Sequence, residues 1–203
     1  KIPAGEEFPP LTVRDPVQAG EKRLSVTRPD APNIFNLVFK TPEVGDPSLY
    51  ALDIVEGVLN GRSGRLYKRL VEEEKLAVSA GASNSPNKYV SEFSVTVNLR
   101  PEADVEKVER IVWEELDKLK VNPVSDREFR RVKNHAYAGL IRSLTDMENV
   151  ATMLAWYEMY GDYKIFLNWA DNLDKVTPSQ VQSIASATFD HEKAVTGTLL
   201  KKK

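Results

Sequence analysis

Cysteine is absent from the 203-residue sequence, and histidine occurs only at His135 and His191. Without cysteine the chain can form no disulfide, no thiolate nucleophile and no zinc site of a cysteine-containing type. Long hydrophobic runs are also missing. The longest extend over a few residues, whereas a transmembrane helix needs about 20. We therefore expect no membrane span in this chain.

A charge excess of either sign is lacking as well, since 28 lysine and arginine residues stand against 30 aspartate and glutamate residues. A net charge of −2 gives no basic field to hold a phosphate backbone, so we expect no nucleic-acid binding. Hydrophobic residues make up 41% and charged residues 29% of the chain, which is typical of a soluble globular domain. A domain of this length can bury a sizeable hydrophobic core without stabilisation by disulfides or metal ions.

The first 20 residues differ from the rest in composition. They contain Pro3, Pro9, Pro10 and Pro16 and show no hydrophobic periodicity. This composition predicts an extended linker or arm over residues 1–20, followed by one domain over residues 21–203. The chain starts at Lys1 with no signal-peptide core behind it, so we interpret it as a fragment or processed chain that does not include its targeting signal.

Hydrophobic patterns predict the order of strands and helices. Alternating residues indicate strands over 22–28, 34–41, 76–82, 89–99 and 193–200, and in the fourth of these one face should be buried, namely that of Phe93, Val95 and Val97. Apolar residues at helical spacing indicate a helix that begins at Asp46-Pro47 and a second over 63–74. After Pro101 most of the chain is predicted to be helical. Helix-start signals stand at Ser125, Thr145 and Thr177.

This order places short-linked strands beside blocks of helices, without one-for-one alternation. Such an order favours an α+β fold with a largely antiparallel sheet and helices packed on one face, and it argues against a doubly wound parallel sheet.

Residue chemistry alone predicts no active site in this chain. Neither His135 nor His191 has the second histidine that a neighbouring-residue zinc motif requires, so we predict no metal ligand and no catalytic residue. The turn 61–66 could hold an anion at a helix N-terminus, but a sharp corner between helices is the favoured interpretation. The run Glu72-Glu73-Glu74 is interpreted as a solvated helix end, because consecutive helical residues point in different directions.

The run LNGRSGRLYKRLVEEEKLAVS, residues 59–79, resembles the helix-to-strand segment of pitrilysin/insulinase-type zinc metallopeptidases, the family that includes mitochondrial-processing-peptidase-like proteins. The arm ending in QAGEKR, residues 18–23, and the TPSQV start at Thr177 extend the resemblance over most of the chain. The resemblance implies α+β domains that work in pairs, of which the amino-terminal one carries an H-x-x-E-H zinc motif. This chain lacks that motif and therefore resembles the carboxy-terminal domain. The implied zinc belongs to the parent protein and not to this chain.

The resemblance also points to two positions that contact substrate. In active pairs, the later domain often supplies an arginine and a tyrosine seven residues apart, and Val71 and Val78 occupy those positions here. Valine has neither the charge nor the hydroxyl group, so that role does not transfer to this chain. Such a loss fits the second domain of a zinc-carrying subunit whose separate partner supplies the pair. It fits a pseudo-peptidase equally well.

Three functions from different classes remain open. The leading hypothesis is a non-catalytic half that closes a peptide-binding chamber over a homologous zinc-bearing domain or subunit, in a parent protein that is a zinc-dependent endopeptidase of the bacterial periplasm or cytoplasm. The alternative is a structural pseudo-peptidase domain that acts only in subunit assembly. An unrelated ligand-binding α+β domain is disfavoured, because glycine fingerprints for phosphate binding are absent from the sequence.

Overall fold

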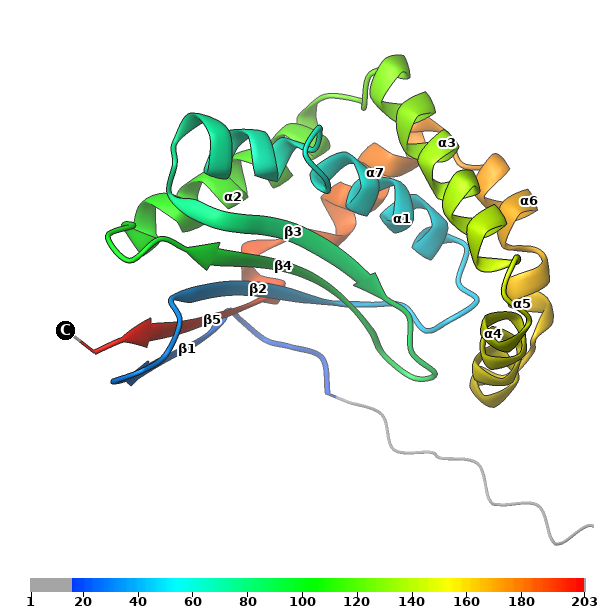
Figure 1. Cartoon of the computed structure of the whole chain (residues 1–203), viewed down its shortest axis with the longest axis horizontal. Coiled ribbons are helices and arrows are strands. Elements are labelled where there is room, and N and C mark those ends of the chain that lie inside the picture. The colour runs from blue at the N-terminus through cyan, green and yellow to red at the C-terminus, as the bar shows by residue number, and fades with distance from the viewer. Residues whose placement is uncertain (1–15, 203) are drawn as a thin grey trace, which may run out of the picture.

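A computed structural model describes residues 16–202. It contains one five-stranded sheet in the order β1-β5-β2-β4-β3 (Figure 1). The strands are β1 (Lys22–Arg28), β2 (Ile34–Thr41), β3 (Ala77–Ser85), β4 (Ser91–Leu99) and β5 (Ala194–Lys201). Three of the four pairings are antiparallel, and only β1 and β5 run parallel. The predicted α+β fold with a largely antiparallel sheet is therefore confirmed.

The strand that comes last in the sequence, β5, is an interior strand of the sheet. β5 lies between β1 and β2, pairing Val195 with Lys22 on one side and with Val38 on the other. The first two strands follow each other in sequence but are not neighbours in the sheet, so the turn at residues 29–33 does not join a hairpin pair. Residues 16–20 lead into β1 without helix or strand, and the remainder of the predicted N-terminal linker, residues 1–15, lies outside the described residues.

The helices gather over one face of the sheet (Figure 1). They are α1 (Ser48–Leu59), the π-helix η1 (Tyr67–Glu73), α2 (Val105–Val121), α3 (Asp126–Ser143), α4 (Met147–Tyr160), α5 (Lys164–Leu167), α6 (Trp169–Asp174), α7 (Pro178–Thr188) and the 3-10 turn η2 (His191–Lys193). α1, α2 and α7 pack together close to the sheet, while α3 to α6 form an arm at one end. The predicted helix over 63–74 exists, but its hydrogen bonding is mostly of the π type.

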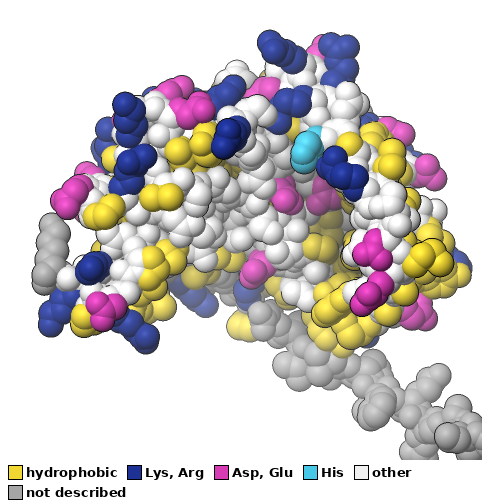
Figure 2. All heavy atoms as spheres, viewed as in Figure 1, with side chains coloured by type: hydrophobic (Ala, Val, Ile, Leu, Met, Phe, Trp, Pro, Cys, Tyr) yellow, Lys and Arg dark blue, Asp and Glu magenta, His cyan; other side chains and the backbone are white. Residues whose placement is uncertain are grey.

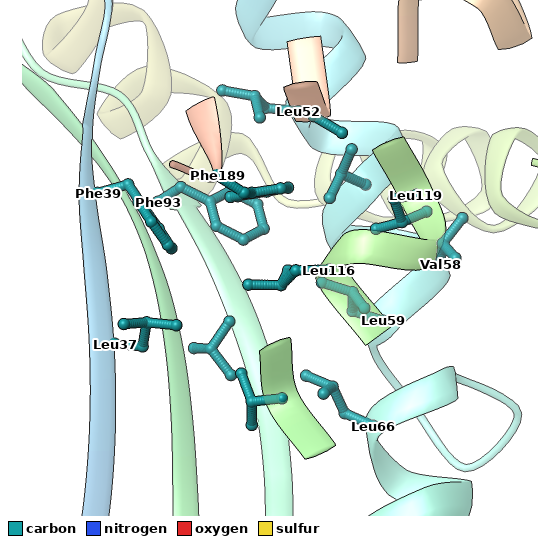
Figure 3. Close-up of a cluster of buried hydrophobic side chains, with 14 of the residues drawn as sticks. Leu37, Phe39, Leu52, Val58, Leu59, Leu66, Phe93, Leu116, Leu119 and Phe189 are labelled. Carbon is teal, nitrogen blue, oxygen red and sulfur yellow. The ribbon is translucent and has the colours of Figure 1, made fainter. Parts of the chain in front are cut away.

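The hydrophobic core fills the space between the sheet and α1, α2 and α7 (Figure 3). Phe93, Val95 and Val97 of β4 are fully buried on this side, as their alternation with polar residues predicts. The rings of Phe39 and Phe93 both lie about 5 Å from that of Phe189, which follows α7. Burial of large side chains of this kind contributes roughly 1.5–3 kcal/mol each, so this core is what holds α1, α2 and α7 on the sheet.

Caps explain where most helices begin. Ser125 accepts a hydrogen bond from the Glu128 backbone N–H, and Thr177 forms a full capping box with Gln180, as predicted. The predicted start at Thr145 is wrong by one residue, because the Asp146 carboxylate accepts the free N–H groups of α4. A carboxylate is as good an N-cap as threonine and also interacts favourably with the helix dipole.

The arm formed by α3 to α6 is held on α1 through α3 and α6, while α4 is exposed. Gly57 of α1 faces Val132 of α3 so closely that a Cβ atom at Gly57 would overlap the Val132 Cγ1. α4 has no buried residue, and Met147 on it is 85% exposed. No helix among residues 16–202 is long and apolar enough to cross a membrane.

Candidate functional site

The face of the sheet opposite the helices is polar over β3 and β4. Thr96 and Asn98 are exposed on β4, and Ser79 and Ser83 are exposed on β3. The Thr96 hydroxyl donates to the Asn36 side chain at 3.0 Å, and the Asn98 amide donates to the Ser79 hydroxyl at 2.7 Å. This polar open face therefore offers exposed hydroxyl and amide groups on a rigid support.

Val71 and Val78 lie in different surroundings. Val71 is partly buried on η1, where it packs against the core. Val78 is 63% exposed on β3, at an irregularity where the register between β3 and β4 shifts between Ala77 and Ser79. Only Val78 thus presents most of its side chain to the surroundings, and neither residue offers a polar group.

The two histidines lie in separate surroundings and do not meet at one site. His191 stacks on the Trp113 indole at 3.6 Å between ring centroids, and His135 is exposed on α3. Within residues 16–202, no group of three histidine, aspartate or glutamate side chains is placed to hold a metal ion. The zinc of pitrilysin/insulinase-type enzymes therefore does not fit the side chains of this domain, and no chemical step through zinc is assigned to them.

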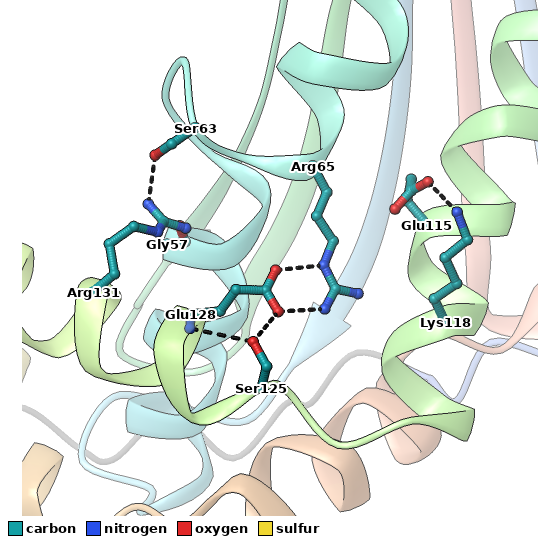
Figure 4. A network of polar contacts seen from close by, with 8 residues as sticks. All are labelled: Gly57, Ser63, Arg65, Glu115, Lys118, Ser125, Glu128 and Arg131. Carbon is teal, nitrogen blue, oxygen red and sulfur yellow. Dashed lines mark hydrogen bonds and ion pairs between the residues drawn. The ribbon is translucent and has the colours of Figure 1, made fainter.

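The turn after α1 is a structural corner, as favoured from its sequence. Gly61 has a φ of 77°, and a Cβ atom at Gly64 would overlap the Asn60 carbonyl oxygen, so both glycines are required. Arg65 and Ser63 then tie this corner to α3 (Figure 4). The Arg65 guanidinium forms two hydrogen bonds of 3.0 Å with the Glu128 carboxylate and lowers the pKa of Glu128 to about 2.

A pocket of about 790 Å³ opens between α1 and the arm, on the helix side of the sheet. Its walls come from α1, α3, α4, α5 and α6 and from the loops that precede α1 and follow it. About half of the wall residues have apolar side chains, including Leu49, Val132, Leu140, Met153 and Phe166. Arg62, Arg131 and His135 also border the pocket. The volume is within the range of small-molecule binding sites.

Two carboxylates of α1 border this pocket. Asp53 accepts hydrogen bonds from the Asn84 Nδ2 at 2.7 Å and from the Trp169 Nε1 at 3.1 Å. Glu56 accepts from the Asn84 backbone N–H at 3.1 Å. Burial raises the pKa of Asp53 and raises that of Glu56 to about 7, because both carboxylates are removed from water and the Asp53 charge adds to the effect on Glu56.

Sequence patterns did not single out these pocket residues. Asp53 and Glu56 interrupt the apolar run of α1 at a spacing of three, which places both on one helix face, and this interruption was the available signal. Asn84 and Trp169 come from distant segments, and only the tertiary structure brings them to the same carboxylate.

Comparison with protein families decides the assignment. The family described as "Peptidase M16 inactive domain" matches residues 1–135, about two thirds of the chain. The chain belongs to this family. The resemblance to pitrilysin/insulinase-type zinc metallopeptidases is thereby confirmed, and so is the interpretation of this chain as their inactive domain.

Individual proteins similar to this M16 inactive domain are consistent with the family match. "Zinc protease PqqE" of Helicobacter pylori is 24% identical over 192 residues, which cover 93% of this chain and 43% of that protein. A solved Helicobacter pylori protease has a TM-score of 0.90 at 22% identity, covering 97% of this chain and 48% of its own. The inactive peptidase domain from Bordetella parapertussis has a TM-score of 0.78 at 22% identity and is covered over 98% of its length. The chain thus spans about half the length of the first two relatives.

Proposed function

We propose that this M16 inactive domain closes a peptide-binding chamber over a homologous zinc-bearing domain or subunit. The observation that carries the proposal is the polar open face over β3 and β4, a broad rigid surface without a metal site of its own. Hydroxyl and amide groups such as those of Thr96 and Asn98 can hydrogen-bond a peptide backbone without selecting its sequence. The domain would act by positioning the peptide and excluding water, rather than by supplying a reacting group.

The lengths of the relatives support the pairing. Two of them are about twice as long as this chain, so each contains a second segment of the size of one domain. Zinc, the nucleophilic water and the general base would all belong to that partner. Peptide turnover is therefore expected only from an assembly that contains both halves.

Substitution on the open face tests the chamber. Thr96→Tyr adds a bulky side chain at an exposed position of β4, where tyrosine is compatible with a strand. In the full-length protein we expect a several-fold higher KM for a fluorogenic peptide with an unchanged zinc content. Asn134→Tyr, at an exposed position of α3 on the helix side, is the matched control and should leave KM unchanged. Identical kinetics of both variants and the wild type would contradict the chamber.

The valine pair provides a second test of substrate contact. Replacing Val71 with arginine and Val78 with tyrosine restores the residue types that resemblance associates with these positions. Peptidase activity should rise if the domain works with a zinc domain of its own chain, and it should change little if a separate subunit already supplies the pair. Turnover by full-length protein is measured with and without that subunit. The single variant Val78→Tyr accompanies it, because Val78 is exposed and Val71 packs on the core.

Assembly without substrate contact is the second candidate, and α4 favours it. This helix has no buried residue, and Met147, Trp156 and Met159 on it are 85%, 49% and 54% exposed. Trp156 and Met159 are three residues apart and share one face of α4, and exposed apolar side chains that form one patch commonly mark a protein–protein contact. Under the assembly function, Trp156→Ser weakens association of the domain with its partner half, while Thr96→Tyr has no effect on any property of the complex.

A further inference from the structure

The carboxylates that border the pocket have no positive partner. Four hydrogen-bond donors hold them: the Asn84 side chain and the Trp169 indole on Asp53, and the Asn84 backbone and the Asn60 side chain on Glu56. All four donors are neutral. Among residues 16–202, no lysine, arginine or histidine forms an ion pair with either carboxylate. Buried carboxylates are normally paired or bound to a cation, because burial of an unpaired charge is costly.

A third acceptor in the same place lacks a hydrogen-bond donor altogether. The Asn84 Nδ2 donates to the Leu49 carbonyl oxygen at 3.1 Å and to Asp53, which fixes the orientation of the amide. Its Oδ1 atom is buried and has no hydrogen-bond donor. Buried polar atoms without a partner are rare in folded proteins, so an acceptor of this kind indicates a missing donor. Asn84 comes from β3 and the carboxylates from α1, so acceptors from two elements meet at this place.

The rest of the pocket is suited to an apolar body. The Tyr157 and Phe166 rings stack at 5.7 Å between centroids, and Met153 and Leu140 continue the wall. Figure 2 shows acidic side chains in a hollow of the visible face, with hydrophobic side chains beside them. The Arg131 guanidinium, which also borders the pocket, is already bound to the Ser63 hydroxyl at 2.9 Å and the Gly57 carbonyl oxygen at 3.2 Å.

We propose that this pocket binds an organic cation, a primary ammonium or guanidinium group carried on an apolar chain. The cation lies against Asp53 and Glu56 and donates a hydrogen bond to the Asn84 Oδ1, while the apolar chain lies along Tyr157 and Phe166. An ammonium has three donors and a guanidinium five, enough for all three acceptors. Charge-assisted hydrogen bonds are about twice as strong as neutral ones. A neutral or anionic ligand of the same shape leaves the carboxylates unpaired.

This chemistry has two sources, a free amine and a basic side chain of a peptide. Calorimetric titration of the full chain at pH 8 with hexylamine, hexanol and hexanoate tests the free amine. Titration with acetyl-Leu-Lys-Leu-amide and acetyl-Leu-Gln-Leu-amide tests the side chain. We expect one site per chain, with the cationic probe of at least one series binding at least tenfold more tightly than its neutral or anionic analogues. The series with the higher affinity identifies the source.

Variants assign the binding to the pocket. Asp53→Asn preserves the shape of the side chain and removes its charge. The affinity of the chain for the cationic probe should therefore fall at least tenfold. Glu102→Gln removes one negative charge at an exposed position outside the pocket and should change nothing. The Trp169 indole N–H donates to Asp53, so its NMR resonance should shift on titration in the wild type and in Glu102→Gln.

The proposal is overturned if cationic and neutral probes bind equally, or if Asp53→Asn and Glu102→Gln behave alike. Circular dichroism establishes that each variant is folded. Should Asp53→Asn not fold, Glu56→Gln takes its place with the same expected loss. A Trp169 resonance that does not move while calorimetry records binding also contradicts the assignment, because the probe would then lie elsewhere.

Discussion

Substitution of Gly57 by alanine tests how α3 is held on α1. A Cβ atom at Gly57 would overlap the Val132 Cγ1 and lie 3.2 Å from Cγ2 and 3.3 Å from Cβ. Overpacking of this kind costs about 1–3 kcal/mol, whereas alanine gains about 1 kcal/mol over glycine in a helix interior. Gly57→Ala should therefore lower the free energy of unfolding by up to about 2 kcal/mol. Gly139→Ala is the matched control, because nothing lies within 4 Å of its Cβ and the helix gain should appear alone.

The double variant separates the steric contact from other effects of alanine. Val132→Ala removes the Cγ1 and Cγ2 methyl groups at a buried position, at a cost of about 2 kcal/mol. Alanine at position 57 then has more room, so the double variant should be up to about 1 kcal/mol more stable than Val132→Ala alone. The coupling energy between the sites is expected to be about 1–3 kcal/mol from urea unfolding curves. Additive effects, or a Gly57→Ala variant more stable than the wild type, would refute the reasoning.

Three further results are expected. Glu56→Gln should stabilise the domain at pH 8 by at most about 3 kcal/mol. The pKa of Glu56 is raised from 4.5 to about 7, so the wild type gains stability as pH falls through that interval and the difference disappears below pH 4.5 in urea titrations. Glu128→Gln should lower the free energy of unfolding by about 1–2 kcal/mol at pH 7, because it removes the ion pair with Arg65. The loss is no larger because the Glu128 side chain is 30% exposed and the pair is partly screened by water. That loss should vanish between pH 4.5 and about 2, and an equally large loss at pH 2 would contradict the Arg65 pairing. Metal analysis of the chelator-rinsed chain should find no stoichiometric zinc, and one tightly held zinc per chain would contradict the assignment.

Much of the fold could be predicted because local patterns coincide with the final packing. The alternation around Phe93 and Val95 indicates the buried face of β4 without knowledge of its neighbours. The capping box at Thr177 depends on residues within one turn, and such signals survive in any tertiary context. The place of β5 between β1 and β2 could not be predicted, because no local pattern specifies which distant strand pairs with which.

The candidate sites divide in the same way. Val71 and Val78 could be located through the resemblance, yet their different exposure depends on how η1 packs and on the irregularity in β3. The pocket was not predicted, because it is created by the angle between the arm and α1. Asp53 receives hydrogen bonds from a residue 31 positions away and from one 116 positions away. Sequence spacing contains no information about such a meeting.

The interior position of β5 determines the order in which this sheet can be completed. β5 is synthesised after the other four described strands, and β1 pairs with no strand among residues 16–202 except β5. The backbone groups of β1 and one edge of β2 therefore stay unpaired until β5 has been synthesised, and closing contacts over 173 residues is entropically slow. Unpaired strand edges are the usual origin of aggregation during synthesis. Loss of residues 194–201 would accordingly remove two strands from the sheet instead of one.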